Sequence, residues 1–479
     1  MFYTLKPAYS LRGWQKLPRA VVAEGVVSPW FPDEETFDVL RLCNGRCDFS
    51  LPFISDRRRR IAEQLFRNGM TERSDCPSSL LPEQEYRLYP ARYIRTAHWS
   101  ITGKCNFNCR HCCMSASEGK LGELPLSTIL SMAEELARCG VRSVSLTGGE
   151  PLIRGDFWQI VDALLERKII ITAVYSNGWL VNDDFLDRLQ ARGLSGCEIN
   201  MSYDGAGMHD WLRGVEGAEK AVLEAFRRCR DRGIPTASEM CIHRGNADTL
   251  RETVLLLAEL GCGYLKTNPV SDLGSWKENG RGSSIGSREL FQLYTDYIPR
   301  YFEDGAPLDL HLGGAFLGYK GDTLHYDIPL NRTGEDPEKV SFCTHARNYL
   351  YISPEGRALP CFSLSGMDVQ ERFPLIPETG LERCLNDSFY MRLLDTKAAE
   401  VLRSNPECGD CEYRSACLGG CRAGALETKP DDFLGIDPFS CEFYRGRWME
   451  KIRSAAEEAI SRSGGTEGRN KQEPQKEQP

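Results

Sequence analysis

Between residues 98 and 268, short apolar runs alternate with longer segments in which apolar residues recur every three or four positions. The short runs are typical of buried strands, and the longer segments are typical of helices with one buried face. The predicted strands span 99–102, 144–147, 169–175, 197–202, 237–242 and 264–267, and the predicted helices span 127–137, 157–165, 183–189, 218–230 and 247–260. Such alternation indicates βαβ units, so we expect an α/β fold built as a partial or full six-stranded barrel.

The first residues, 1–75, predict a separate small α+β unit. Apolar residues between 17 and 27 suggest a hairpin with Gly25 near its turn. Asp33 is expected to cap a first helix, and Ser55 a second helix that ends at Asn68-Gly69. The Ser-, Pro- and Glu-rich segment 76–97 is interpreted as a linker to the barrel at 98–268.

The carboxyl-terminal half has weaker patterns. Residues 269–342 show no clear periodicity and are interpreted as a bridging region. Residues 343–445 are rich in cysteine, so we expect a small domain organised by metal clusters instead of a large apolar core. Residues 446–479 predict the end of a helix followed by a tail with almost nothing to bury, which should be disordered.

Composition narrows the class of protein. The 479 residues suggest several domains, and the net charge of -9 gives no support for nucleic acid as a partner. No apolar run is long enough to cross a bilayer and the first residues lack a secretory pattern, so we expect no membrane partner and a cytoplasmic location. A reducing cytoplasm does not sustain a disulfide framework, and the 20 cysteines therefore indicate metal ligation.

The first cysteine motif follows the first predicted barrel strand. Cys105, Cys109 and Cys112 stand in the sequence CNFNCRHC, on a loop at the strand's carboxyl end. Three thiolates can hold three irons of a [4Fe-4S] cluster and leave the fourth iron open. A structural zinc site normally has four protein ligands, and chance in a cysteine-rich chain is the other alternative.

This motif resembles the signature of the radical S-adenosylmethionine (SAM) superfamily. Membership implies that SAM binds the open iron and yields a 5′-deoxyadenosyl radical that abstracts a hydrogen atom. His111 occupies the place of an aromatic residue beside the adenine. Further matching motifs end the next three strands, and the SAM contacts implied are His111, Gly148, Gly149, Glu150, Pro151, Ser176, Asn177, Ser202 and Arg213. Glu150 could neutralise an ammonium group, Arg213 could bind a carboxylate, and Asp204 lies on the cofactor side.

A second cysteine set lies near the carboxyl end. Its members are Cys408, Cys411, Cys417 and Cys421, with Cys343, Cys361 and Cys441 around them. A zinc ribbon is one alternative, but seven cysteines are one short of two four-cysteine sites. The set resembles the SPASM extension of radical SAM enzymes, which implies auxiliary cluster I on Cys343, Cys361 and Cys421 and auxiliary cluster II on Cys408, Cys411, Cys417 and Cys441.

Three [4Fe-4S] clusters are therefore expected, with the fourth ligand of auxiliary cluster I open. Cys113 and Cys384 remain as spare thiols for which inert packing is the simpler interpretation. Sulfatase-maturing SPASM enzymes carry an aspartate base after the second SPASM cysteine. Here that residue is Phe362, which cannot accept a proton, so this subfamily is disfavoured.

The amino-terminal unit resembles, at the level of pattern, the winged-helix-like recognition element of enzymes that mature ribosomally made peptides. Such elements bind a leader peptide as an added strand. A small domain without a ligand is the alternative, and the basic run Arg57 to Arg60 is interpreted as a solvated helix face or a contact for an acidic peptide.

Together the resemblances predict a radical SAM/SPASM maturase that modifies a precursor peptide and takes electrons from a flavodoxin or ferredoxin-type reductant. A thioether cross-link is the preferred product, with other cross-links and epimerisation left open. A sulfatase-maturase-like oxidoreductase and a non-enzymatic cluster scaffold that binds peptides are the alternatives. No catalytic residue can be assigned from the sequence.

Overall fold

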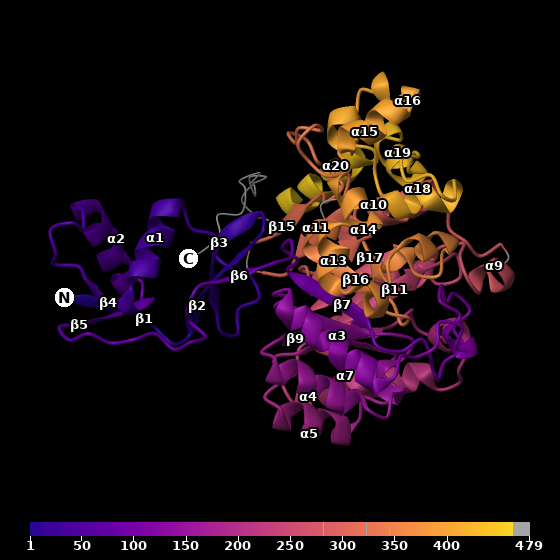
Figure 1. Cartoon of the computed structure of the whole chain (residues 1–479). Coiled ribbons are helices and arrows are strands. Elements are labelled where there is room, and N and C mark those ends of the chain that lie inside the picture. Colours follow the sequence, from indigo (N-terminus) through magenta and orange to yellow (C-terminus); the bar gives the residue numbers. More distant parts are fainter. Residues whose placement is uncertain (281, 322, 344, 463–479) are drawn as a thin grey trace.

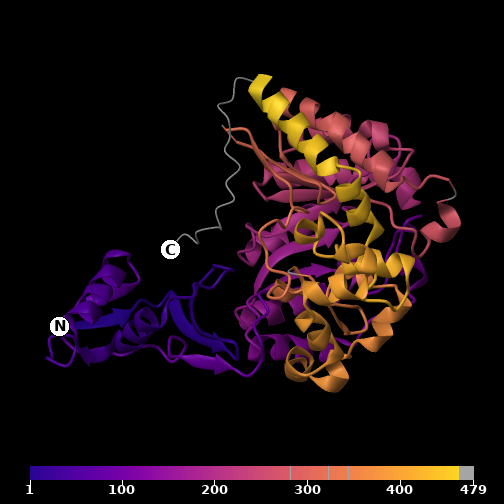
Figure 2. The same ribbon diagram turned by 90° about the horizontal axis from the view of Figure 1, so that it is seen from above.

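The structure is a computed structural model that describes residues 1–280, 282–321, 323–343 and 345–462. An amino-terminal unit projects from one side of a larger body, and two views at right angles show the same separation (Figures 1 and 2). Within these described ranges, no helix combines the length and apolar character needed to cross a bilayer. The predicted disordered tail lies outside the described residues beyond position 462.

Two small sheets and two helices form the amino-terminal unit. The first sheet has the order β4-β1-β5 and the second the order β3-β2-β6. The strands are β1 (Phe2–Leu5), β2 (Tyr9–Trp14), β3 (Leu17–Ala23), β4 (Asn44–Asp48), β5 (Thr71–Ser74) and β6 (Arg87–Tyr89), and the helices are α1 (Glu34–Leu42) and α2 (Asp56–Arg67). The predicted caps are confirmed, because Asp33 accepts a hydrogen bond from Thr36 N and Ser55 accepts one from Arg58 N.

Two predictions for this unit were wrong in detail. The chain turns between β2 and β3 at residues 15–16, and Gly25 belongs to a second reversal that ends in a single bridge between Val21 and Trp30. The segment 76–97 is more than a linker, since its strand β6 pairs with β2. The indole N–H of Trp14 donates to Cys139 O at 3.1 Å, so this second sheet also contacts the larger body.

The larger body is built on an 11-stranded sheet in the order β15-β14-β13-β12-β11-β10-β9-β8-β7-β16-β17. All six predicted strands are present as parallel neighbours: β7 (Thr96–Ser100), β8 (Ser143–Thr147), β9 (Ile170–Ser176), β10 (Glu198–Ser202), β11 (Thr236–Ile242) and β12 (Tyr264–Pro269). The connecting helices are α3 (Leu126–Arg138), α4 (Phe157–Glu166), α5 (Asp183–Ala191), α6 (His209–Arg213), α7 (Ala218–Asp231) and α8 (Leu250–Glu259). The sheet ends at β15 and β17, so the barrel is open, as a partial barrel requires.

The bridging region continues this sheet instead of forming a separate unit. It contains α9 (Trp276–Asn279), α10 (Ser287–Glu303), β13 (Asp309–Leu312), β14 (Phe316–Tyr319) and β15 (His325–Asp327). Strand β13 runs parallel to β12, and β14 and β15 follow as antiparallel neighbours. The periodicity missed these strands because each is only three or four residues long.

The cysteine-rich region shares the barrel's core, which corrects the expectation of a domain held mainly by metal. Strand β16 runs parallel to β7, and Leu350, Ile352 and Leu385 are buried in the same apolar cluster as the barrel strands. The elements are β16 (Tyr349–Ile352), β17 (Ala358–Leu359), α11 (His345–Asn348), α12 (Ile376–Thr379), α13 (Leu381–Asn386), α14 (Phe389–Asp395), α15 (Ala398–Ser404), α16 (Pro406–Gly409), α17 (Arg414–Cys417), α18 (Arg422–Thr428), α19 (Pro438–Arg445) and α20 (Trp448–Arg462).

Candidate functional site

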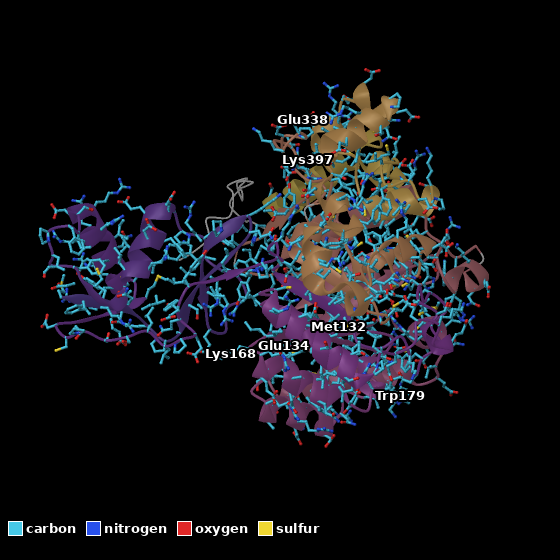
Figure 3. The ribbon with its side chains drawn as sticks, in the orientation of Figure 1. Met132, Glu134, Lys168, Trp179, Glu338 and Lys397 are labelled. Carbon is cyan, nitrogen blue, oxygen red and sulfur yellow. The ribbon has the colours of Figure 1, made fainter. Side chains whose placement is uncertain are left out.

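The loop that follows β7 carries Cys105, Cys109 and Cys112 at the carboxyl edge of the barrel. It is braced by the segment of α6, because Arg110 N donates to Leu212 O and Arg110 Nε donates to Trp211 O, both at 2.9 Å. These hydrogen bonds hold the loop against the edge of the barrel. Nearby Trp179 lies on the side of the body away from the amino-terminal unit (Figure 3), and its ring contacts Phe107 with centroids 5.8 Å apart.

Each of the three sulfurs in this loop has an N–H group beside it. Phe107 N lies 3.3 Å from Cys105 Sγ, Ala116 N lies 3.3 Å from Cys112 Sγ, and an Arg213 guanidinium nitrogen lies 4.0 Å from Cys109 Sγ. Burial raises the pKa of the Cys105 thiol to about 12. N–H donors aimed at sulfur stabilise the thiolate form that iron requires, so this donor set fits an iron-sulfur cluster.

The Gly-Gly-Glu-Pro motif after β8 is hydrogen-bonded directly to the cysteine loop. Gly149 N donates to Thr102 O at 2.8 Å, and Glu150 N donates to Lys104 O at 2.9 Å. A Cβ atom on Gly149 would lie 2.2 Å from Lys104 O, so the close approach of the two backbones requires glycine here. Gly148 makes a similar approach to Thr102 O, and Pro151 begins the short turn that follows.

Glu150 is completely buried and its carboxylate joins two of the predicted motifs. It accepts from Asn177 N at 2.7 Å and from Ser176 Oγ at 3.1 Å. Burial raises the pKa of Glu150 to about 7, although these hydrogen bonds oppose that shift. The side chain of Ser176, predicted to contact SAM, therefore holds Glu150, while Asn177 Nδ2 donates to Asn106 Oδ1 in the cysteine loop.

The fourth motif forms a buried charge pair. Arg213 Nε donates to Asp204 Oδ2 at 2.7 Å, and His209 Nδ1 lies 3.1 Å from the same oxygen. Burial alone would raise the pKa of Asp204, but the Arg213 charge and the His209 hydrogen bond lower it far below its usual range. The predicted role of Arg213 toward a cofactor carboxylate stays a prediction, because part of its guanidinium already binds Asp204. His111 lies beside this pair, and burial lowers its pKa to about 3.

The second cysteine set divides into two groups in space. Burial raises the pKa of the Cys361 thiol to about 12, and Cys421 and Cys343 contribute to that shift as close neighbours. The Cys441 thiol likewise has its pKa raised by burial and by Cys408 and Cys411. Cys417 has Cys441 and Cys408 as neighbours. The division of these thiols between two auxiliary clusters stays a prediction, and no set of described Cys, His, Asp or Glu side chains has the geometry to hold a single metal ion.

Phe362, beside Cys361, packs against an aromatic group from the barrel. Its ring centroid lies 5.5 Å from that of Tyr351 and 6.5 Å from that of His98. Tyr351 is completely buried, and its hydroxyl lies 2.7 Å from Ser100 Oγ. The position that holds a base in sulfatase-maturing enzymes is therefore part of an aromatic surface here. Cys384 is buried in the core, as expected of an inert thiol, while Cys113 is only half-buried beside Cys112.

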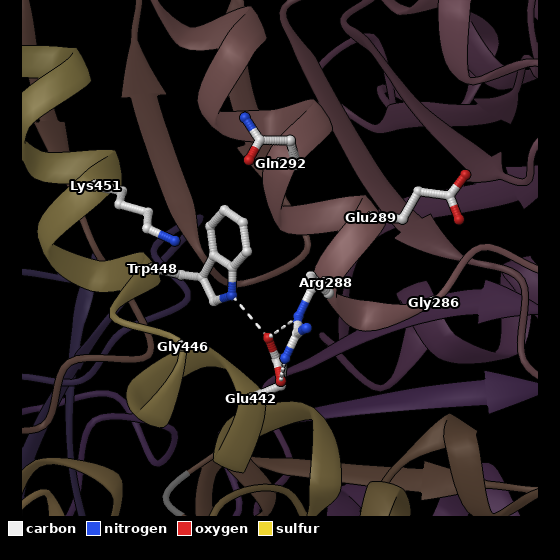
Figure 4. A pocket seen from close by; sticks show the side chains of 8 residues that line it. All are labelled: Gly286, Arg288, Glu289, Gln292, Glu442, Gly446, Trp448 and Lys451. Atoms are coloured by element: carbon white, nitrogen blue, oxygen red, sulfur yellow. Dashed lines mark hydrogen bonds and ion pairs between the residues drawn. The ribbon is translucent and has the colours of Figure 1, made fainter.

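A surface pocket of about 720 Å³ lies elsewhere, between α10, α19 and α20 (Figure 4). Glu442 accepts from Arg288 Nε and from the Trp448 indole N–H, both at 3.1 Å. The Lys451 ammonium lies 3.8 Å from the centre of the Trp448 ring. None of the predicted site residues lines this pocket, so it is distinct from the cysteine loop.

Sequence reasoning missed three titratable residues that face the interior of the barrel: Glu239 on β11, Lys266 on β12 and His311 on β13. They are half-buried and alternate along their strands with fully buried apolar residues such as Met240, Leu265 and Leu310. This period of two is visible in the sequence of β13, where Asp309 and His311 alternate with two leucines. It was a signal for a polar barrel interior.

Comparison with known proteins agrees with the geometry of this site. Residues 99–257 match the Radical SAM superfamily. The matched residues include the three-cysteine loop and the motifs that end the next three strands of the barrel.

Relatives of the chain differ in what they act on. The PqqA peptide cyclase of Gluconobacter oxydans (strain 621H) is 25% identical over 329 residues, which cover 68% of this chain and 85% of that protein. An AdoMet-dependent heme synthase of Methanosarcina barkeri (strain Fusaro / DSM 804) is 25% identical over 373 residues, covering 74% of this chain and 97% of that protein.

A solved structure shares the fold over most of the chain. Streptococcus suis SuiB bound to precursor peptide SuiA matches with a TM-score of 0.65 at 15% identity, and the match covers 92% of this chain and 100% of that chain. Residues 1–95 make up more of the chain than this comparison leaves uncovered, so the likeness includes part of the amino-terminal unit.

Proposed function

We propose that the protein is a radical SAM enzyme of the SPASM type that modifies a ribosomally made precursor peptide. The observation that carries the proposal is the cysteine loop, in which three sulfurs with N–H neighbours lie at the carboxyl edge of the barrel. When bound, a cluster on Cys105, Cys109 and Cys112 together with SAM supplies a 5′-deoxyadenosyl radical that abstracts a hydrogen atom. Two auxiliary [4Fe-4S] clusters on the second cysteine set complete the expected cofactors.

The chain's own residues fix and shield this chemistry. Glu150, held by Ser176 Oγ and Asn177 N, places a carboxyl group where it can bind an ammonium group of the cofactor. Arg213, held by Asp204, directs a cation toward the Cys109 sulfur and toward a cofactor carboxylate. These buried groups keep their orientation without help from solvent, which is what control of a reactive radical requires.

The choice of a peptide substrate is supported by the amino-terminal unit. It resembles leader-recognition elements, and the fold comparison with SuiB, a protein whose structure contains its precursor peptide, extends into this unit. Its sheets end in strands such as β5 and β6, which a leader could extend through backbone hydrogen bonds. Because this unit projects from the body (Figure 1), a peptide docked there would reach the barrel through an extended segment.

A thioether cross-link is the product we favour, because the inner group of Cys343, Cys361 and Cys421 has three thiols for a four-iron cluster and leaves one iron for a peptide thiolate. The electrons would come from a flavodoxin or ferredoxin-type protein. A sulfatase-maturase-like oxidation is disfavoured, since Phe362 lies in an aromatic surface and cannot act as a base.

Two assays test this function. In the first, reconstituted enzyme is incubated with SAM, dithionite and the small peptide encoded beside its gene, and the peptide is analysed by mass spectrometry. We expect 5′-deoxyadenosine and a loss of two mass units for each cross-link. Formation of 5′-deoxyadenosine with an unchanged peptide would contradict peptide maturation.

The second assay measures metal and binding. Iron and sulfide analysis should give about twelve irons per chain for three four-iron clusters. Zinc as the only metal would contradict the assignment. The isolated peptide leader should bind equally well to the native protein and to a Cys105, Cys109 and Cys112 to Ala variant. The cysteine loop contacts Trp179, which lies on the side of the body away from the amino-terminal unit (Figure 3).

A further inference from the structure

One row of residues crosses four neighbouring strands at the level of the cofactor motifs. Ser202 on β10 pairs in register with Glu239 on β11, Glu239 pairs with Lys266 on β12, and Lys266 pairs with His311 on β13. Residues in register on parallel strands point to the same face of a sheet. Ser202 is a predicted SAM contact. The other three residues of the row therefore lie at the same height in the barrel as the predicted cofactor site.

The side chains of this row project into the barrel interior. Met240, Leu265 and Leu310, which follow or precede them in sequence, are fully buried on the other face among the helices. Beyond the effect of burial, Lys266 lowers the pKa of His98 on the distant strand β7, which indicates that its ammonium group reaches across the interior. Glu239 likewise adds to the raised pKa of Tyr175 on β9.

The row is rich in hydrogen-bonding groups that other side chains do not use. His311 Nδ1 lies 2.8 Å from the Tyr264 hydroxyl, which fixes the ring, while His311 Nε2 is buried without a hydrogen-bond partner among the described residues. No described hydrogen bond or ion pair involves the Lys266 ammonium or the Glu239 carboxylate. A buried polar atom is normally satisfied, so the unpaired His311 Nε2, with an ammonium and a carboxylate in the same row, indicates a binding surface beside the cofactor level.

We propose that Glu239, Lys266 and His311 form the substrate wall of the barrel, on which Lys266 and His311 donate hydrogen bonds to a peptide carbonyl and Glu239 is the catalytic base. This inference rests on the proposed function and deepens it. The Lys266 ammonium and the His311 N–H are donors that can bind a carbonyl oxygen. The Glu239 carboxylate, two strands from His311, can accept a proton that the bound peptide releases.

The balance of the cross-linking reaction shows why a proton acceptor is needed. One new bond replaces a C–H bond and an S–H bond of the peptide, so two hydrogens must leave. The first leaves as a hydrogen atom and is recovered in 5′-deoxyadenosine. The second leaves as a proton, which Glu239 accepts. A four-iron cluster held by Cys343, Cys361 and Cys421 would supply the one-electron oxidant for the electron that remains.

The test compares Glu239→Gln with a matched carboxylate in the same interior. Glu198 lies at the opposite end of β10, in register with Ala173, so it shares the interior with Glu239, whose charge it senses, but stands outside the level of the row. Both variants are incubated with SAM, dithionite and the neighbouring-gene peptide, and the ratio of cross-linked peptide to 5′-deoxyadenosine is measured. Loss of a general base should lower this ratio about a hundredfold in Glu239→Gln. Glu239→Asp should restore part of it, and Glu198→Gln should match the native ratio.

Lys266 is tested separately through peptide affinity. Lys266→Met should raise the KM for the peptide about tenfold, as expected for the loss of one charged hydrogen bond, and Lys266→Arg should restore it. Iron content should stay at the native value in every variant, which separates a local role from a folding defect.

The outcomes distinguish this inference from the proposed function. A native-like product ratio in Glu239→Gln, with the native enzyme active, would overturn the assignment of the base alone. An equal fall in Glu198→Gln would also overturn it, because any charge in the interior would then suffice. A native enzyme that leaves the peptide unchanged would overturn the proposed function, and this inference with it.

Discussion

Arg213 Nε lies 2.7 Å from Asp204 Oδ2, and the same guanidinium lies 4.0 Å from Cys109 Sγ. Asp204 is completely buried and also accepts a hydrogen bond from Cys241 N at 3.0 Å. The pair thus connects the fourth strand end with the cysteine loop. The contact between Arg213 and Cys109 joins residues 104 positions apart in the sequence.

Removal of one partner of this pair should be more harmful than removal of both. Arg213→Met leaves the Asp204 carboxylate buried without its cation and should lower the free energy of unfolding by about 3–5 kcal/mol. The double variant Arg213→Met with Asp204→Asn should lose less, because no charge is then left unpaired. Urea denaturation of the metal-free protein measures both. Equal losses would show that the pair contributes no charge compensation.

The buried carboxyl of Glu150 predicts a specific pH dependence of stability. Its pKa is about 7 in the folded chain, raised by burial from 4.5. Below pH 4.5 both the folded and the unfolded states are protonated; above it the unfolded state ionises first. The contribution of Glu150 to the free energy of unfolding is therefore fully present below pH 4.5. About 3 kcal/mol of it is lost as the pH rises from 4.5 to 7.

The variant Glu150→Gln tests that pH dependence. The metal-free variant should show a flatter dependence of the urea midpoint between pH 5 and 7 than the native chain, because glutamine does not ionise. Asp162→Asn is a suitable control, since Asp162 is a more exposed carboxylate with a lowered pKa, held by Arg192, and should leave that pH range unchanged. Parallel curves for native chain and Glu150→Gln would refute the assigned shift.

The backbone contact between two motifs predicts a strong effect of a single methyl group. Gly149→Ala would place a Cβ 2.2 Å from Lys104 O, so the strand that leads into Cys105 would have to move. We expect less iron in the reconstituted protein and a weaker affinity for SAM, measured by iron analysis and calorimetry. Gly155→Ala is the matched control, because nothing lies within 4 Å of its added Cβ. Native iron content in Gly149→Ala would contradict the close approach.

The barrel could be predicted from the sequence because each of its strands is a short segment rich in buried residues and is followed by a helical pattern. The bridging region could not be predicted for the opposite reason. Strands such as β13 (Asp309–Leu312) are stabilised by pairing with β12, a long-range contact that local periodicity does not contain. The same limit applies to β6, whose pairing with β2 joins residues about 75 positions apart.

The candidate site, like the fold, could be predicted from the sequence only in part. The cysteine spacings predict candidate ligands such as Cys105, Cys361 and Cys441, since ligand spacing is a local property. The partners that hold them, such as Asp204 for Arg213 and Ser176 for Glu150, depend on which strand ends meet in space. The row of Glu239, Lys266 and His311 depends on strand register and became visible only in the folded chain.

The most direct test of the central claim compares the native protein with the variant in which Cys105, Cys109 and Cys112 are replaced by Ala. Both are reconstituted with iron and sulfide and supplied with SAM and dithionite, and 5′-deoxyadenosine is measured by chromatography. The native protein should produce 5′-deoxyadenosine, while the variant should produce none and contain about four fewer irons per chain. Equal 5′-deoxyadenosine from both proteins would contradict the account.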